Sequence, residues 1–501
     1  MAISHKILKL CFLAGVSSLV TAVGCGGGGG PVIPHTTGNF TNASFKGSYV
    51  FQVRGVISST FSPYRQVGVI TADGNGNITG GVEDVNAQGT AGAIESTSVT
   101  GSYSVANDGT GQLTLNSTAL GSLFSGTPIS FAITLASSSK VQLVEADFFA
   151  DGSGSAELQD ANAANATPAG PFVFGIHEDL NINSASESQV GMFTVASGNL
   201  TGSMDQNTVA GASSTTITGS IDAPTILGSG TATITDGSNN STPFLYFIVN
   251  SGKFLLLPTN AAIGSGSAEA QTGAVSAGLS GNYVFGSRGD DLNAVGASAT
   301  VGQFTANGAN ISAGALDAMQ DGNYSNLVQF TGSVAGNVSA QGREEITLSV
   351  GPTMVFWLVS PSRAFFLDEA SGAVEDGTAD LQAGSSFSAS AIKGQYALVM
   401  DGTDFINGQE VARIGTLQFD GSSKITLVEL VNDSLSGGGA QSPGALTGNY
   451  QVGGSGRITT QISGNNGGGP DLVMYAISGS QAYAMQIDAG VNTSGVVQLQ
   501  Q

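Results

Sequence analysis

The sequence is poor in cysteine, in charge and in the residue types that most often perform chemistry. Its 501 residues include two cysteines, three histidines and one tryptophan, and only 10% of the residues are charged. Both cysteines, Cys11 and Cys25, lie near the N-terminus, so the rest of the chain cannot form a disulfide within itself. The fold must therefore rest on burial and on hydrogen bonding.

Basic residues are scarce as well. Fourteen lysines and arginines stand against 36 aspartates and glutamates, which gives a net charge of −22. A surface of this sign repels phosphate backbones, so the composition argues against nucleic-acid binding. No stretch beyond the N-terminal segment approaches ~20 consecutive apolar residues, so we expect no transmembrane helix there.

The residues that are abundant point to many small β units. Glycine is the commonest residue (74), and 24 phenylalanines and 10 tyrosines are spread along the whole length. With 41% hydrophobic residues the chain can build packed cores despite its low charge. Its length suggests three or four domains.

The N-terminal segment, residues 1–24, has the features of an export signal: a basic start, an apolar stretch and then small residues. It ends in Ala22-Val23-Gly24-Cys25, which resembles the lipobox of bacterial lipoproteins. The resemblance implies cleavage between Gly24 and Cys25, lipidation of Cys25 and membrane anchoring. Ala22 replaces the more usual leucine, and ordinary signal cleavage is the alternative. Gly26, where the family's retention signal is aspartate, implies transfer outward, and residues 25–43 form a glycine-rich tether.

Four repeats become visible when the sequence is compared with itself. "GSGSAELQ", "GSGSAEAQ", "EDGTADLQ" and "TSGVVQLQ" end at Gln159, Gln271, Gln382 and Gln500. Each repeat begins with an aromatic strand, such as "GSYVF" at 47–51, and has a glycine in its second strand, such as Gly68 in "QVGVIT". The predicted domains are 44–162, 163–273, 274–384 and 385–501.

Each repeat is predicted to be an all-β unit of eight strands. In the first repeat the strands are expected at 47–56, 64–72, 77–86, 96–106, 111–118, 128–136, 140–147 and 154–159, with alternating apolar residues and Asp-Gly turns between them. Short strands joined by tight turns must protect their edges, and closure into an antiparallel up-and-down barrel does so. We therefore predict four tandem eight-stranded barrels, with a β-sandwich or a propeller as alternatives.

Catalytic residues are not apparent. His177 is the only histidine within a repeat, and its counterparts in the other repeats are Arg54, Arg288 and Asp401. This position is interpreted as a polar site flanking a loop rather than as a catalytic base. The tripeptide Arg288-Gly289-Asp290 has the form of an adhesion motif. Its first two residues match Arg54-Gly55 of the first repeat, so only the acid Asp290 is added. No G-x-S-x-G motif is present, and no cofactor is predicted.

One stretch resembles a calcium loop. "DGNGNITGGVED" places Asp73, Asn75 and Asn77 at alternate positions and Asp84 twelfth, but its sixth residue is Ile78 where such a loop needs glycine. We favour a hairpin turn and predict no metal site, with these four residues as the weak candidate.

These observations together predict a lipid-anchored, non-enzymatic protein of the bacterial outer membrane or cell surface. Its β modules would bind or space an extracellular or envelope component of unknown identity, and its membrane contact would be the N-terminal lipid. A carrier that holds small apolar ligands inside the barrels is the alternative, and a surface hydrolase is third. Secretion without an anchor is the alternative location.

Overall fold

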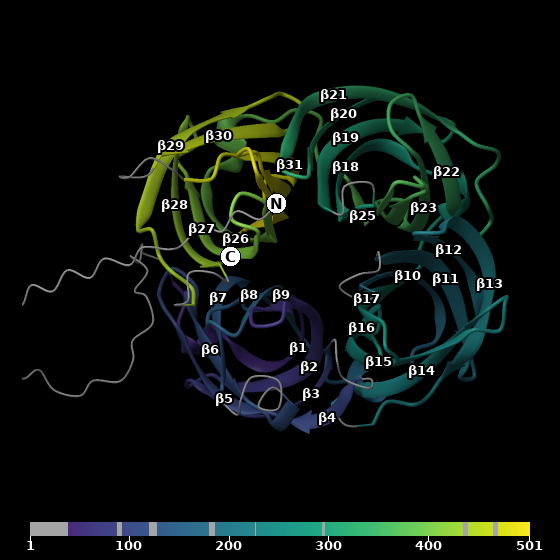
Figure 1. Ribbon diagram of the computed structural model, residues 1–501, viewed down its shortest axis with the longest axis horizontal. Helices are drawn as coiled ribbons and strands as arrows, with labels where there is room; N and C mark the ends of the chain where they lie inside the picture. The colour runs from purple at the N-terminus through teal and green to yellow at the C-terminus, as the bar shows by residue number, and fades with distance from the viewer. Residues whose placement is uncertain are drawn as a thin grey trace, which may run out of the picture.

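The computed structural model describes residues 39–87, 93–119, 128–179, 186–225, 227–292, 296–433, 439–463 and 469–501. It consists of four antiparallel β-barrels arranged as a ring (Figure 1). The prediction of four tandem eight-stranded barrels is confirmed, and neither a sandwich nor a propeller is formed. Within the described residues no helix is both long and apolar enough to cross a membrane.

Barrel 1 closes through the pairing of β1 with both β2 and β9. The strand expected at 96–106 is divided into β4 and β5, which both pair with β3, and the other seven strands agree with expectation to within a few residues. Its elements are the 3-10 helix η1 (Asn42–Ser44), β1 (Lys46–Ile57), β2 (Ser62–Asp73), β3 (Asn77–Ala87), β4 (Ile94–Ser98), β5 (Thr100–Val105), β6 (Thr110–Asn116), β7 (Ile129–Ser137), β8 (Lys140–Glu145) and β9 (Ala150–Leu158).

Barrels 2, 3 and 4 are closed eight-stranded barrels, each preceded by a 3-10 helix. Barrel 2 contains η2 (Ala163–Asn165), β10 (Gly170–Asp179), β11 (Glu187–Ala196), β12 (Asn199–Thr208), β13 (Gly211–Ile221), β14 (Ser229–Asp236), β15 (Ser241–Asn250), β16 (Lys253–Pro258) and β17 (Ile263–Ala270). Barrel 3 contains η3 (Val275–Ala277), β18 (Ser280–Asp291), β19 (Gly296–Asn307), β20 (Asn310–Gln320), β21 (Asn323–Val334), β22 (Arg343–Leu348), β23 (Thr353–Ser360), β24 (Arg363–Asp368) and β25 (Ala373–Leu381). Barrel 4 contains η4 (Ala389–Ile392), β26 (Gly394–Asp404), β27 (Gln409–Phe419), β28 (Lys424–Asp433), β29 (Ala445–Val452), β30 (Arg457–Ser463), β31 (Leu472–Ser478), β32 (Gln481–Gln486) and β33 (Val491–Leu499).

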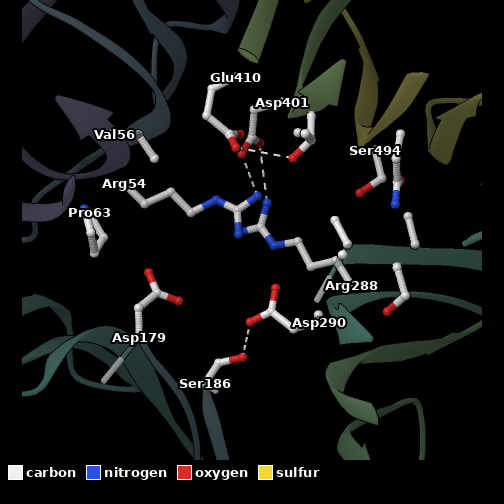
Figure 2. A pocket seen from close by; sticks show the side chains of 18 of the residues that line it. Arg54, Val56, Pro63, Asp179, Ser186, Arg288, Asp290, Asp401, Glu410 and Ser494 are labelled. Atoms are coloured by element: carbon white, nitrogen blue, oxygen red, sulfur yellow. Dashed lines mark hydrogen bonds and ion pairs between the residues drawn. The ribbon is translucent and has the colours of Figure 1, made fainter. Parts of the chain in front are cut away.

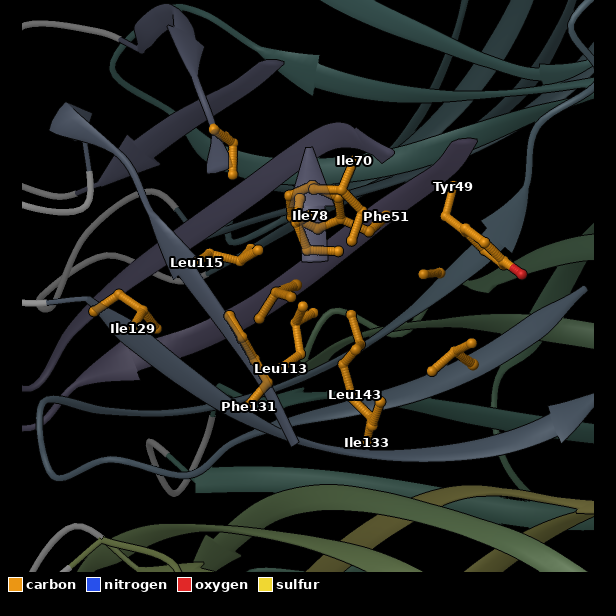
Figure 3. Close-up of a cluster of buried hydrophobic side chains, with 14 of the residues drawn as sticks. Tyr49, Phe51, Ile70, Ile78, Leu113, Leu115, Ile129, Phe131, Ile133 and Leu143 are labelled. Carbon is orange, nitrogen blue, oxygen red and sulfur yellow. The ribbon is translucent and has the colours of Figure 1, made fainter. Parts of the chain in front are cut away.

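The interior of each barrel is filled with side chains. In barrel 1, Tyr49, Phe51 and Val53 alternate along β1 and point inward, where they join a cluster of fully buried aliphatic and aromatic residues (Figure 3). The other three barrels contain equivalent clusters. Full burial of one such side chain stabilises the folded state by about 1.5–3 kcal/mol.

The glycine repeated in each second strand makes room for this packing. A Cβ atom on Gly68 would lie 2.8 Å from the ring of Phe51 and 2.5 Å from the carbonyl oxygen of Val82. Gly302 in barrel 3 has the same relation to Phe285, at 2.6 Å. In barrels 1 and 3 the glycine therefore makes room for the ring of the opening strand, whereas in barrels 2 and 4 Gly191 and Gly415 make room for the third strand.

Neighbouring barrels pack in the same way around the ring. The outward faces of the first two or three strands of one barrel contact the sixth and seventh strands of the next barrel, and barrel 4 contacts barrel 1 so that the ring closes. At the interface between barrels 1 and 2, for example, Val50 and Val67 join Leu245 and Phe247 in one buried cluster. All four contacts are therefore head-to-tail interfaces of one type.

The glutamine that ends each repeat joins one barrel to the next. Gln159 donates its side-chain N–H groups to the backbone oxygens of Leu227 and Ile248 in barrel 2, both at 2.8 Å. Gln271 and Gln382 make the equivalent pairs of bonds to barrels 3 and 4. Gln500 donates to Asp108 and Leu135 of barrel 1, also at 2.8 Å, so the last repeat closes the ring with the same contact.

Candidate functional site: a polar channel on the ring axis

The opening strand of every barrel faces the centre of the ring. Four outward-pointing residues at equivalent positions of β1, β10, β18 and β26 meet there: Arg54, His177, Arg288 and Asp401. Two cavities of about 830 and 430 Å³ share these residues, and all four barrels contribute to the lining of both. The cavities are thus two parts of one polar channel that follows the ring axis.

Two arginines and one carboxylate cross the axis. Asp401 accepts hydrogen bonds from Arg54 at 2.5 Å and from Arg288 at 3.2 Å. Figure 2 shows the two guanidinium groups facing each other with Asp401 beside them. These bonds connect barrels 1, 3 and 4 at residues that line both cavities.

His177 of barrel 2 completes this layer and lies between carboxylates. Its Nδ1 is 2.6 Å from Oδ1 of Asp376 in barrel 3, and its Nε2 is 3.6 Å from Oδ1 of Asp179. Burial alone would lower the pKa of His177, but Asp376 and Asp179 outweigh it and raise the pKa well above 6.5. The imidazole is therefore held as a cation by these two carboxylates.

Further acids surround this layer. Asp179 binds Arg65 at 2.5 Å, and Ser186 donates a hydrogen bond to Asp290. Glu410 lies beside Asp401 (Figure 2), and burial raises its pKa to about 8. The acidic residues that line the larger cavity outnumber its arginines; they are Asp151, Asp179, Asp290, Asp291, Asp401 and Glu410, against Arg54, Arg65 and Arg288.

The smaller cavity is bordered by ion pairs between neighbouring barrels. Glu157 binds Lys140 of its own barrel and Lys253 of barrel 2, both at 2.7 Å. Although burial opposes it, the two ammonium groups lower the pKa of Glu157 to about 2. Between barrels 2 and 3, Arg363 binds Glu269 at 2.8 Å, and its neighbour in sequence but one, Phe365, lines the smaller cavity. These pairs hold the walls of the channel together.

The weak calcium candidate is not assembled. Asp73 accepts hydrogen bonds from the backbone of Asn75 and Asn77 and from the side chain of Asn77, which lower its pKa to about 2 and close the hairpin turn before β3. Asp84 lies seven residues further along β3 than Asn77, about 23 Å away for an extended strand, and is buried. The favoured hairpin is therefore the structure found.

The remaining site residues named from the sequence are Gly24, Cys25 and His177. Gly24 and Cys25 lie outside the described residues, so lipidation and cleavage stay predictions. His177 lies in β10, two residues before the strand ends at Asp179, and lines the channel. The sequence analysis missed Arg65, Asp179 and Asp290 as channel residues. The available signal was that Asp179 and Asp290 follow His177 and Arg288 by two residues on the same strand face, and that Arg65 stands opposite Arg54 on β2.

Comparison with known proteins adds little. No protein-family model matches the chain, and no curated protein matches its sequence. A solved structure, that of the isotype 1 transferrin binding protein B from serogroup B Neisseria meningitidis, is similar at 7% sequence identity and a TM-score of 0.17, over 72% of this chain and 83% of that chain. A likeness this low supports no argument, so the site is interpreted from its own geometry.

Proposed function

We propose that the protein is an exported, lipid-anchored, non-enzymatic binding protein of the bacterial outer membrane or cell surface, and that its axial channel binds a small polar ligand. The observation that supports a binding role is the convergence of charged side chains from all four barrels on one channel. The lipobox-like residues 22–25 support the anchor.

The packing of the barrels favours a site between them over a site within them. The two cavities lie on the ring axis, whereas the barrel interiors contain clusters of buried apolar side chains. A carrier of apolar ligands would need a hollow interior of matching polarity. The packing therefore weighs against the carrier alternative.

The ionic state of the channel favours binding over hydrolysis. A general base needs a carboxylate or imidazole that is able to accept a proton. Asp401 is bound by two guanidinium groups and His177 is held as a cation by its neighbours. The cationic His177 is therefore a poor proton acceptor, and the oxygens of Asp401 are occupied by the two guanidinium groups, which weighs against the surface-hydrolase alternative.

The anchor is tested by expressing the full-length chain in a bacterial host with labelled palmitate. We expect label and membrane fractionation in the parent chain and in Cys11→Ser, and loss of both in Cys25→Ser. Mass spectrometry of the N-terminal peptide identifies the modified residue. A mature protein with an unmodified thiol at Cys25, found in the soluble fraction, would contradict the anchor and favour secretion.

The binding role is tested by thermal-shift and native mass-spectrometric screening of the full chain against small amines, amino acids, carboxylates and short glycans. Arg54→Gln changes the channel, and Lys424→Ala removes an exposed cation at a hairpin far from it. We expect at least one ligand class whose effect is lost in Arg54→Gln and kept in Lys424→Ala. A response that both variants retain would place binding outside the channel.

A further inference from the structure

His177, Asp179 and Asp290 form a compact group of nitrogen and oxygen donors in the channel. One donor atom from each lies within 4.8 Å of the other two. We propose that these residues form a three-ligand site for a first-row divalent transition ion such as Zn²⁺. This rests on the channel being a binding site and is independent of the lipid anchor.

The backbone brings the three donors together from two barrels. His177 and Asp179 are two residues apart on β10, so both point out of barrel 2 toward the axis, and Asp290 points to the same place from β18 of barrel 3. Ligand atoms around tetrahedral zinc lie about 3.4 Å apart, given bonds of about 2.1 Å. The widest separation in the group therefore has to contract by up to about 1.4 Å, a shift within reach of side-chain rotation.

The surroundings orient these donors as the outer shell of a metal site does. Metal-binding histidines usually give their second ring nitrogen to a carboxylate, which fixes the ring and raises its basicity. Asp376 occupies this position, 2.6 Å from Nδ1, which leaves Nε2 directed at Asp179. Arg65 binds Oδ2 of Asp179, whereas Oδ1 is the atom that faces His177. Ser186 donates a hydrogen bond to Oδ2 of Asp290 and so orients that carboxylate.

The charge of the channel favours a cation over an anion. The larger cavity is lined by six acids, among them Glu410 with a pKa of about 8, against three arginines and the cationic His177, so its own negative excess is small, and the whole chain adds a net charge of −22. Such a field concentrates cations near the axis. One imidazole with two carboxylates suits Zn²⁺ or its neighbours, whereas Ca²⁺ prefers six to eight oxygens. Three protein ligands also leave a fourth position for the polar ligand of the proposed function.

The test is titration of the full-length, metal-stripped protein with Zn²⁺ by calorimetry and with Co²⁺ by visible absorption. We expect one ion per chain and the intense d–d bands of four-coordinate Co²⁺. His177→Ala, Asp179→Asn and Asp290→Asn should each weaken Zn²⁺ binding by more than about hundredfold. Each variant removes a direct ligand, and loss of an outer-shell partner alone typically costs about tenfold to hundredfold. Asp73→Asn is the control, because Asp73 lies in the hairpin turn outside the channel, and should leave affinity and spectrum unchanged.

Asp376 is a positioning residue. Asp376→Asn should weaken Zn²⁺ binding about tenfold to hundredfold with one ion still bound, and shift the Co²⁺ spectrum, while Asp376→Glu restores both. Circular dichroism confirms that each variant is folded. Absence of Zn²⁺ binding by the parent chain, or equal binding by folded His177→Ala, would overturn the site. A polar solute that still binds in an Arg54-dependent way would then leave the proposed function standing.

Discussion

The interface between barrels 2 and 3 and the ring-closing interface between barrels 4 and 1 use equivalent strands but fill one central position differently. Between barrels 2 and 3, Asp205 accepts two hydrogen bonds from Arg343 at 2.8 Å and one from Trp357 at 2.7 Å. At the ring-closing interface the residue at the position of Asp205 is Leu430, which is buried in an apolar cluster. The interface between barrels 3 and 4 follows the charged pattern through Asp317 and Arg457.

This difference teaches that the geometry of the ring does not depend on charge pairing. A buried ion pair and well-packed apolar residues of similar volume often contribute similar stability, because desolvation offsets the attraction between the charges. Leucine opposite an arginine, or aspartate opposite an apolar surface, is strongly unfavourable. The charged residues therefore determine which barrel faces fit together, and the apolar surfaces supply most of the adhesion.

The largest expected effect comes from breaking the charged pattern on one side. Asp205→Leu leaves the Arg343 guanidinium and the Trp357 N–H without their acceptor in a buried interface. We expect the free energy of unfolding to fall by about 3–5 kcal/mol. Urea-induced unfolding of the full chain, followed by hydrogen exchange at β12 and β23, measures this loss.

The double variant Asp205→Leu with Arg343→Thr is the matched control, because it copies Leu430 and the equivalent Thr110 of the ring-closing interface. Its unfolding free energy should recover most of the loss, because both members of the ion pair are replaced, but should stay about 1–3 kcal/mol below the parent chain, because the buried Trp357 N–H still lacks its acceptor. A double variant as unstable as the single one would show that the charge pair itself is required.

The next largest effect concerns an asparagine of the ring-closing interface. Asn432 donates to the carbonyl oxygens of Glu145 and Ala150 at 2.9 Å and of Asp147 at 3.2 Å, whereas the equivalent residue of barrel 3 is Met319. Asn432→Ala should cost about 2 kcal/mol, because the buried carbonyls lose their donor. Hydrogen exchange should rise at β8 and β28. Equal protection in parent and variant would contradict this role.

A smaller difference in hydrogen exchange is expected between variants of the glutamines that end the repeats. Gln271→Ala and Gln500→Ala each remove two hydrogen bonds to backbone oxygens, worth about 1–2 kcal/mol in total. We expect Gln500→Ala to increase exchange more, since its interface has Leu430 where the interface of Gln271 has the ion pair of Asp205 with Arg343. Exchange rates of the amides in β7 and β23 give the comparison, and a larger effect from Gln271→Ala would reverse our ranking of the interfaces.

The smallest effect on stability is expected from lowering the pH. Burial alone would raise the pKa of Asp317, but hydrogen bonds from Arg457, Tyr324 and Tyr475 lower it below 3.8. A carboxyl whose pKa is depressed by folding stabilises the protein above its unfolded value, and this contribution is lost as pH falls through the folded value. Hydrogen exchange below about pH 3.8 should therefore increase at β20 and β30 before it increases at β28, where Leu430 lies. Simultaneous loss would contradict the assignment.

The sequence was sufficient for the fold of each repeat because local patterns determine it. These patterns depend on neighbours within one barrel. They are the alternation of inward and outward residues along β1, turn residues such as Gly74, and the recurring glycine at the position of Gly68. The channel depends instead on the angle between barrels, which no local pattern specifies. Arg54 and Asp401 are 347 residues apart and meet only because the ring closes.

Trp357 shows the same limit at a single residue. Its place in an apolar strand predicts a core position, and it is fully buried. Its ring, however, lies outside barrel 3 among Val173, Val190 and Met192 of barrel 2. Alternation assigns residues to two faces of a strand, but it does not distinguish the barrel interior from an interface when both are apolar.

The ring has a consequence for the order of the chain itself. The contacts of Gln500 with barrel 1 equal those of Gln159 with barrel 2, and both Phe40 and Gln500 lie against Gly109. The covalent connection between two barrels is thus not needed to hold them side by side, because the glutamine that ends each repeat makes equivalent hydrogen bonds at all four interfaces. A circularly permuted chain, opened between β9 and η2 and joined from Gln501 to Phe40, would therefore form the same ring with barrel 2 first and barrel 1 last in the sequence.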